Sequence, residues 1–151
     1  MPDKLDPKTL EPRIGTGYPP PYSEKAAGRE KRPLGDPFGL TQYGVNLVKL
    51  PPGGWSSQRH WHTHEDEFVY VLEGELTLVT DAGETPILAG ECAGFPANSG
   101  NGHCLINTSD RDAVYLEMGS RRSEDAVHYP DIDLHLPEGH SGFTRKDGTP
   151  Y

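Results

Sequence analysis

Two histidines and a glutamate within eight residues place the strongest constraint on what this chain can fold into. His60 and His62 stand two residues apart, and Glu67 opens an apolar run over 68–72. Residues i and i+2 of a β-strand share a face, whereas on an α-helix they would diverge by about 200°. Two imidazoles and a carboxylate can therefore converge from neighbouring strands of a hairpin, which predicts a metal site. Such a site needs a further ligand, and His103 is the best candidate.

Turn-forming residues and short alternating segments predict an all-β chain. Among 151 residues there are 18 Gly and 15 Pro, which favours short strands joined by turns over long helices. From Gly39 onward the apolar pattern has a period of two. We expect strands near residues 43–50, 55–61, 67–72, 75–80, 85–88, 92–95, 103–107 and 113–119. Strands at this spacing indicate a sandwich or barrel.

Proline content and polarity divide the chain into three parts. Residues 1–38 form a Pro-rich N-terminal arm, in which we expect no regular structure beyond a helical turn within 23–30. Residues 39–120 form the barrel, and residues 121–151 form a polar tail. Because the tail carries apolar residues at intervals, we expect it to pack on the barrel.

Charge and cysteine content exclude several classes of protein. The net charge is −9, from 23 acidic and 14 basic residues, which argues against nucleic acid or an anionic membrane as partner. We find neither an apolar leader nor a membrane span and expect a cytoplasmic protein. Cys92 and Cys104 are too few for a disulfide scaffold, and we expect both to be buried thiols.

The spacing of residues 54–107 resembles the two motifs of the cupin superfamily. The first motif is matched by Gly54-x5-His60-x-His62-x4-Glu67-x6-Gly74, and the second by Gly90-x5-Pro96-x3-Gly100-x2-His103-x3-Asn107. One feature departs from the family, which usually has a single residue between the Pro and the Gly of the second motif. Here residues 97–99 stand between them, so the turn before His103 is longer.

The resemblance implies a single double-stranded β-helix, or jelly-roll, barrel with extended arms. It also implies that His60, His62, Glu67 and His103 bind one divalent metal per chain. Three imidazoles and one carboxylate suit Zn, Fe, Mn or Ni better than Mg or Ca, which prefer oxygen ligands. With a divalent ion this set carries a charge of about +1, which attracts an anionic small-molecule ligand.

Alternation along the strands suggests which other side chains face the pocket. Gln58 shares a face with the two histidines, and Tyr115 and Glu117 share a face of the last strand, so these three residues are our candidates for catalysis. Val69, Val71 and Leu105 would form apolar walls. We expect Asn107 to brace a turn.

The remaining histidines and the basic residues give weaker signals. His64 competes as a ligand, although residues 63–66 read as a turn. His128, His135 and His140 lie in the polar tail, where histidines usually pack or face solvent. No cluster of Arg or Lys suited to a phosphate lies near the motifs, and Arg59 alternates away from the histidines.

Three functions are compatible with these patterns. The first is a metal-dependent enzyme that acts on a small polar or anionic metabolite as an isomerase, a lyase or decarboxylase, or a dioxygenase. Some small cupins that carry the same His-Trp-His segment are sugar-phosphate-isomerase-like. The second is a small-molecule binding or sensor protein without turnover. The third is a barrel with a closed structural zinc, which His64 would complete.

We predict a homodimer, because arms with aromatic anchors can exchange across a two-fold axis and cupins are often dimers. Sedimentation of the full chain should show a dimer, and removal of residues 1–38 should weaken it. A monomer at working concentration in both forms would contradict the prediction.

Overall fold

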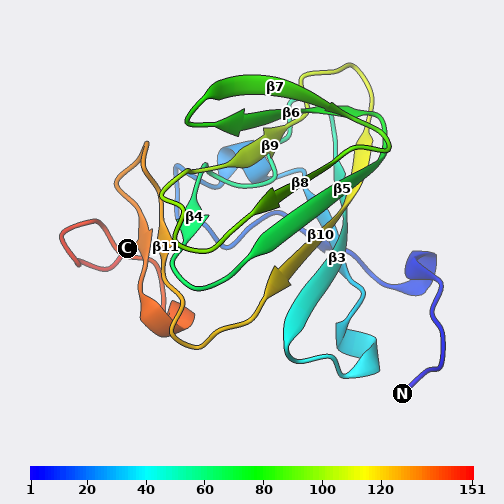
Figure 1. Ribbon diagram of the computed structural model, residues 1–151, viewed down its shortest axis with the longest axis horizontal. Coiled ribbons are helices and arrows are strands. Elements are labelled where there is room, and N and C mark those ends of the chain that lie inside the picture. Colours follow the sequence, from blue (N-terminus) through cyan, green and yellow to red (C-terminus); the bar gives the residue numbers. More distant parts are fainter.

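The computed structural model describes residues 1–151 and contains only β-strands and short 3-10 helices (Figure 1). The strands are β1 (Arg13–Ile14), β2 (Glu30–Pro33), β3 (Tyr43–Leu50), β4 (Trp61–His62), β5 (Glu67–Glu73), β6 (Glu75–Thr80), β7 (Gly83–Leu88), β8 (Cys92–Phe95), β9 (Cys104–Ile106), β10 (Ala113–Ser120), β11 (Val127–His128) and β12 (His135–Leu136). The 3-10 helices are η1 (Pro7–Thr9), η2 (Glu24–Ala26), η3 (Asp36–Phe38) and η4 (Glu138–His140). None of them has the length and apolar character that crossing a membrane requires.

The strands form three antiparallel sheets around two apolar clusters, of which one is much the larger. The largest has the order β1-β2-β3-β10-β5-β8, and the other two have the orders β7-β6-β9 and β12-β11-β4. In Figure 1 the β7-β6-β9 sheet lies above β8 and β5. The larger cluster joins side chains of the six-stranded sheet and of the β7-β6-β9 sheet, among them Val48, Val71, Leu76, Leu105 and Tyr115. The predicted all-β jelly-roll barrel is therefore confirmed.

The register of the large sheet decides which side chains enter the barrel. Tyr115 of β10 stands opposite Val48 of β3 and Val71 of β5, and all three are fully buried. Since alternate residues of a strand share a face, Glu117 and Gly119 follow Tyr115 toward the interior. Burial of these apolar residues is the main source of stability for the barrel.

The N-terminal arm contains more regular structure than its prolines suggest. β2 pairs with β3 over its whole length, so the expectation of an irregular arm up to residue 38 is wrong. Proline is tolerated because Pro33 is the last residue of β2, where the loss of one N–H breaks little of the ladder. The predicted helical turn is present as η2, which Ser23 precedes without a side-chain capping bond.

The segment before β4 is not the strand that we predicted over 55–61. Only β4 and isolated bridges at Trp55 and His60 remain. The side chain of Ser56 accepts a hydrogen bond from Leu105 N at 2.9 Å, and its carbonyl accepts one from Arg29 Nη1 at 2.6 Å. Serine side chains that bind the backbone compete in this way with a regular ladder.

The C-terminal tail meets both the barrel and the N-terminal arm. β11 pairs with β4, and Leu134 is fully buried in a second apolar cluster with Val127 and Tyr129. Tyr18 of the arm packs edge-on against Tyr129, with ring centroids 5.7 Å apart. Both terminal segments therefore cover the same end of the barrel.

The two cysteines differ in exposure. Cys104 is buried as predicted, but Cys92 is exposed, which corrects the prediction. Cys92 stands opposite Tyr70 in the β5–β8 ladder, and Tyr70 is also exposed. Both side chains therefore lie on the outer face of the sheet.

Asn107 braces the turn after β9, as predicted. It is fully buried, and its amide donates to the carbonyls of Leu50 at 2.9 Å and Arg111 at 2.8 Å. Its Oδ1 accepts from Ser109 N at 3.0 Å. A single side chain thus satisfies the buried backbone groups of two neighbouring turns.

Asn107→Ala should destabilise the fold by about 3 kcal/mol, because buried backbone groups lose their partners. Thermal denaturation should show a melting temperature lower by roughly 6–12 °C for a chain of this size. Thr108→Ala, which removes an exposed hydrogen bond to Thr77, is the control and should change little. Equal shifts in both variants would show that Asn107 has no special role.

Candidate metal centre

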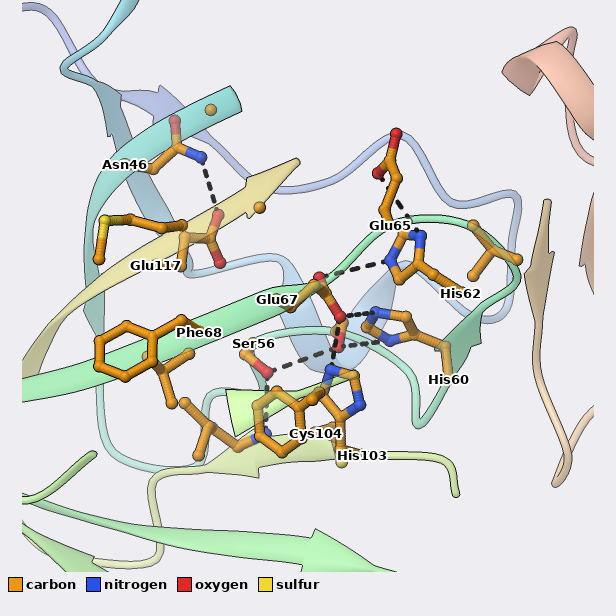
Figure 2. Close-up of a pocket in the computed structure, with 18 of the residues that line it drawn as sticks. Asn46, Ser56, His60, His62, Glu65, Glu67, Phe68, His103, Cys104 and Glu117 are labelled. Atoms are coloured by element: carbon orange, nitrogen blue, oxygen red, sulfur yellow. Dashed lines mark hydrogen bonds and ion pairs between the residues drawn. The ribbon is translucent and has the colours of Figure 1, made fainter. Parts of the chain in front are cut away.

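The four residues of the predicted ligand set lie together inside the barrel (Figure 2). The carboxylate of Glu67, at the start of β5, faces three imidazole nitrogens. Its Oε1 lies 3.3 Å from His62 Nε2, and its Oε2 lies 3.4 Å from His60 Nε2 and 2.6 Å from His103 Nε2. Residues from the two motifs therefore converge on one point.

Backbone pairing holds two of the histidines in place. His60 and His103 form an isolated antiparallel bridge, with N–H to carbonyl distances of 3.1 and 2.9 Å in the two directions. His62 follows in β4, so the first two rings stay on the same side although the expected strand is missing. The two hydrogen bonds of this bridge, together with β4, direct the three imidazole rings at Glu67.

Two of the rings are also held from behind through Nδ1. His60 Nδ1 lies 2.8 Å from the carbonyl of Gln58, and His62 Nδ1 lies 2.7 Å from Asp125 Oδ2. Hydrogen bonds at Nδ1 place the proton there and leave the Nε2 lone pair free for a metal. His103 Nδ1 is buried without a partner, and its ring stacks on Phe95 with centroids 3.6 Å apart.

The ionisation of this group follows from its burial and its close charges. Burial lowers the pKa of His62, but contacts with Glu67 and Asp125 outweigh it and raise the pKa to about 9. Burial raises the pKa of Glu67, but the imidazoles of His60, His103 and His62 hold it well below its usual range. Burial dominates at His103 and lowers its pKa.

The donor set fits a divalent transition metal. Three imidazole nitrogens and one carboxylate are ligands that Zn, Fe, Mn and Ni accept. Glu67 Oε2 is buried and receives no well-directed hydrogen bond, although His103 Nε2 is only 2.6 Å away. A buried carboxylate oxygen in this condition is best satisfied by a cation.

His64 lies outside this group. Its side chain is exposed, and its ring contacts Thr63 Oγ1 at 2.8 Å. The chain turns here, so the alternation that would have placed His64 beside His62 does not continue.

The four residues border a cavity of about 340 Å³. Val69 and Leu105 form part of its wall, as the alternation predicted, whereas Val71 belongs to the apolar core. Tyr115 and Glu117 also line the cavity. Gln58 does not: its amide donates to the carbonyl of Tyr22 at 3.0 Å. The prediction for Gln58 rested on a strand over 55–61, which is absent.

Glu117 is the acidic side chain of the cavity that lies nearest to Glu67 in the register of the sheet. Glu117 pairs with Val69, and Gly119 pairs with Glu67. Glu117 and Glu67 are therefore diagonal neighbours on one face of the sheet, a spacing of about 7–8 Å between residue positions. Gly119 itself stands opposite Gly44. The guanidinium of Arg121 lies against Gly44, and the Glu67 side chain lies against Gly119, so the two glycines make room for these side chains.

Lys31 and Asn46 hold Glu117 in this position. Lys31 Nζ lies 2.8 Å from Glu117 Oε1, and Asn46 Nδ2 donates to the same oxygen at 3.0 Å. The side chains of Lys31 and Glu117 are each 26% exposed. Both contacts fall on Oε1, so Oε2 keeps its capacity to accept a proton or a hydrogen bond.

Sequence reasoning did not identify the basic residues that line this cavity. Arg29 and Lys31 come from the N-terminal arm, and Arg121 follows β10, all remote from the two motifs. The guanidinium of Arg29 donates to the carbonyls of Gly15 and Ser56, and that of Arg121 binds Asp36. Lys31 in turn is paired with Glu117, so each of the three cations has a partner within the chain.

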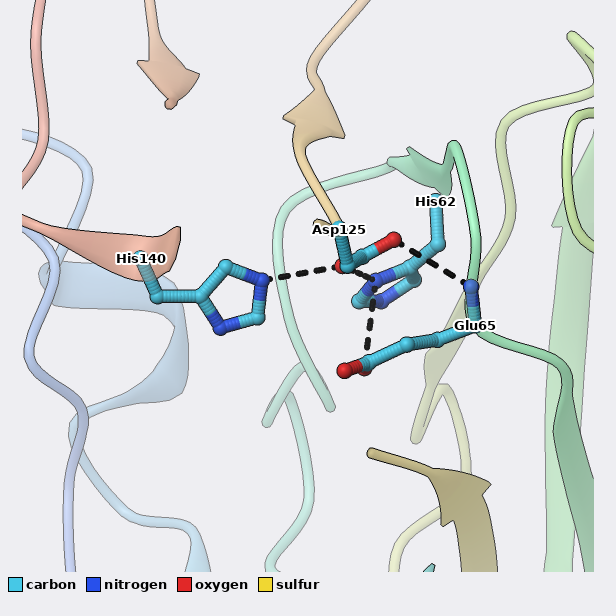
Figure 3. A group of neighbouring side chains, drawn as sticks. All are labelled: His62, Glu65, Asp125 and His140. Atoms are coloured by element: carbon cyan, nitrogen blue, oxygen red, sulfur yellow. Dashed lines mark hydrogen bonds and ion pairs between the residues drawn. The ribbon is translucent and has the colours of Figure 1, made fainter. Parts of the chain in front are cut away.

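A second polar group, formed by His62, Glu65, Asp125 and His140, lies behind His62 (Figure 3). Sequence reasoning missed it, because Asp125 belongs to no motif and His140 was expected to be an ordinary tail histidine. His140 Nε2 lies 2.9 Å from Asp125 Oδ2. The other tail histidines do pack as expected: His128 stacks on Trp61, with centroids 4.4 Å apart, and lies 4.9 Å from the ring of His135.

Comparison with known proteins agrees with this architecture. The profile of the Cupin domain family matches residues 46–119. A crystal structure described as a sugar phosphate isomerase from a cupin superfamily, from Silicibacter pomeroyi, is 46% identical, covers 98% of this chain and 96% of its own, and has a TM-score of 0.91. A putative sugar phosphate isomerase from Acidithiobacillus ferrooxidans is 34% identical over 78% of this chain and 75% of its own, with a TM-score of 0.73.

A curated protein from Thermotoga maritima is also similar. It is named an oxalate-binding protein and is 37% identical over 71 residues, which make up 47% of this chain. The match spans 56% of the length of that relative.

Proposed function

The chain belongs to the cupin superfamily, and on that basis we propose that it is a metal-dependent enzyme that acts on a small anionic metabolite. One observation carries the proposal: three imidazole Nε2 atoms surround the Glu67 carboxylate at 2.6–3.4 Å beside a cavity of about 340 Å³. In this proposal His60, His62, Glu67 and His103 hold one Zn, Fe, Mn or Ni ion. A metal bound there would act as a Lewis acid on a substrate oxygen.

The charges of the cavity support an anionic ligand. Three cationic side chains line it, Arg29, Lys31 and Arg121, and three carboxylates do so, Glu65, Glu67 and Glu117. Since these charges balance, a bound divalent cation leaves the cavity positive. Similarity to proteins described as sugar phosphate isomerases supports the isomerisation of a phosphorylated sugar over the lyase, decarboxylase and dioxygenase alternatives.

Glu117 is our candidate for proton transfer. Aldose–ketose isomerisation needs a base that removes a proton next to a carbonyl and returns it to the neighbouring carbon. Glu117 Oε2 has this capacity on the same face as Glu67, and Lys31 fixes the carboxylate and adds a positive charge for the substrate. Tyr115 is fully buried, with an unpartnered hydroxyl, and remains a second candidate.

A non-catalytic binding protein is the alternative, favoured by the similarity to an oxalate-binding protein. The same metal and positive cavity would then retain an anion without turnover. The cytoplasmic location and the homodimer also stay predictions.

Glu67→Ala should remove about one equivalent of bound metal per chain, because the carboxylate is the only anionic ligand of the set. Elemental analysis of untagged protein, reconstituted with Zn, Fe, Mn or Ni, measures this. Glu73→Ala changes an exposed acid on the same strand and should keep the metal. Wild-type protein that retains none of these metals would contradict the proposal.

Glu117→Gln should lower turnover of an active sugar phosphate by about 10²–10⁴-fold, the usual contribution of a general base, with unchanged metal content. The matched control is Glu30→Gln, which alters a Glu–Lys pair on the outer face of the same sheet. Turnover can be measured over a panel of aldose and ketose phosphates, with proton exchange from solvent as a second readout. Saturable binding without turnover by wild-type protein would favour the binding alternative.

A further inference from the structure

Asp125 of the C-terminal tail is the most completely buried charge next to the proposed metal centre. Its side chain is 0% exposed, although the surrounding tail is polar. A buried carboxylate is retained in a fold only when its oxygens are satisfied. Four groups from two separate parts of the chain satisfy this one, and Figure 3 shows three of the residues that supply them, His62, Glu65 and His140.

The two oxygens of Asp125 have different partners. Oδ2 contacts His62 Nδ1 at 2.7 Å and His140 Nε2 at 2.9 Å. Oδ1 accepts from the backbone N–H groups of His64 at 2.9 Å and Glu65 at 3.2 Å. A carboxylate offers about four acceptor positions, so Asp125 is saturated.

These bonds connect two residues of the proposed ligand set. One bond fixes the ring of His62 from its Nδ1 side, which leaves Nε2 directed at Glu67, 3.3 Å away. The backbone bonds fix the turn after His62, and that turn leads directly into Glu67 at the start of β5. Asp125 therefore constrains His62 through its ring and Glu67 through the preceding turn.

We infer that Asp125 is a positioning residue for the metal centre and that His140 holds Asp125 in place. The inference rests on the proposed metal-binding function. Asp125 sets the tautomer and the ring direction of His62, so that the three Nε2 atoms are arranged before a metal arrives. The C-terminal tail is then part of the site, although it supplies no ligand.

The side chains of His62, Glu65, Asp125 and His140 also offer ligand atoms within 4.8 Å of one another, as a second metal site would. The existing hydrogen bonds argue against that role. Asp125 already has four partners, and Glu65 Oε1 accepts from the backbone of Arg122 at 2.9 Å. Positioning accounts for all these contacts without a further ion.

Metal affinity tests the inference directly. Zn²⁺ and Co²⁺ are titrated into metal-free protein in competition with a chelating dye, and the absorption spectrum of bound Co²⁺ reports its ligand geometry. Asp125→Asn keeps the size of the side chain but replaces an acceptor oxygen with a donor. We expect its metal affinity to fall by about 10–100-fold, as when other partners of metal-bound histidines are lost, with a changed Co²⁺ spectrum.

Variants of two histidines separate positioning from general stability. His140→Ala should weaken metal binding less than Asp125→Asn does, and His140→Gln, which keeps a donor, should restore part of the affinity. His64→Ala is the matched control, because its ring is exposed and only its backbone contacts Asp125. The melting temperature of each metal-free variant shows whether the fold itself has changed. If Asp125→Asn does not fold, the two His140 variants still decide the question.

The outcomes distinguish this inference from the proposed function. Wild-type affinity and spectrum in Asp125→Asn, or in His140→Ala if the first variant is unfolded, would refute the positioning role and leave the metal centre intact. A second equivalent of metal that disappears in these variants while the first remains would show a metal site in place of positioning. No metal in any form, wild type included, would remove the proposed function and with it this inference.

Discussion

The carboxylate of Glu67, whose Oε2 is buried, is the constraint on which the rest of the site depends. A carboxylate inside a barrel is tolerated only if positive or donor groups neutralise it. Here three imidazoles do so from two segments of the chain, at 2.6–3.4 Å. Each of them must therefore be held by its own backbone, and the bridge between His60 and His103 meets that need with two hydrogen bonds.

The large sheet carries both apolar core residues and the acidic residues of the site on its inner face. One row of inward side chains, Val48, Tyr115 and Val71, packs as apolar core. The next row contains Glu117, and the row after it contains Glu67 beside a glycine. Because Gly119 has no side chain, it adds no bulk beside Glu67. Apolar core residues and the two acids therefore occupy successive rows on one face of the sheet.

The sequence was sufficient to predict the barrel, the four converging residues and the brace at Asn107, because each depends on local alternation or on spacing within a motif. It was not sufficient for Lys31, which lines the cavity, or for Asp125, which contacts His62, because both come into place only through pairings between distant segments. The error at Gln58 has a related cause. Serine side chains replace part of the expected strand, so alternation no longer determines where Gln58 points.

The polar tail supplies hydrogen-bond acceptors to backbone N–H groups of the site that have no partner within the barrel. After β4 the chain leaves its ladder and turns, so the N–H groups of His64 and Glu65 need acceptors from elsewhere. Asp125 supplies them and binds the ring of His62 with its other oxygen. A polar segment that lies outside both motifs thereby contributes to the geometry of the centre. Its polarity is what allows it to satisfy backbone groups that an apolar segment would have left unpaired.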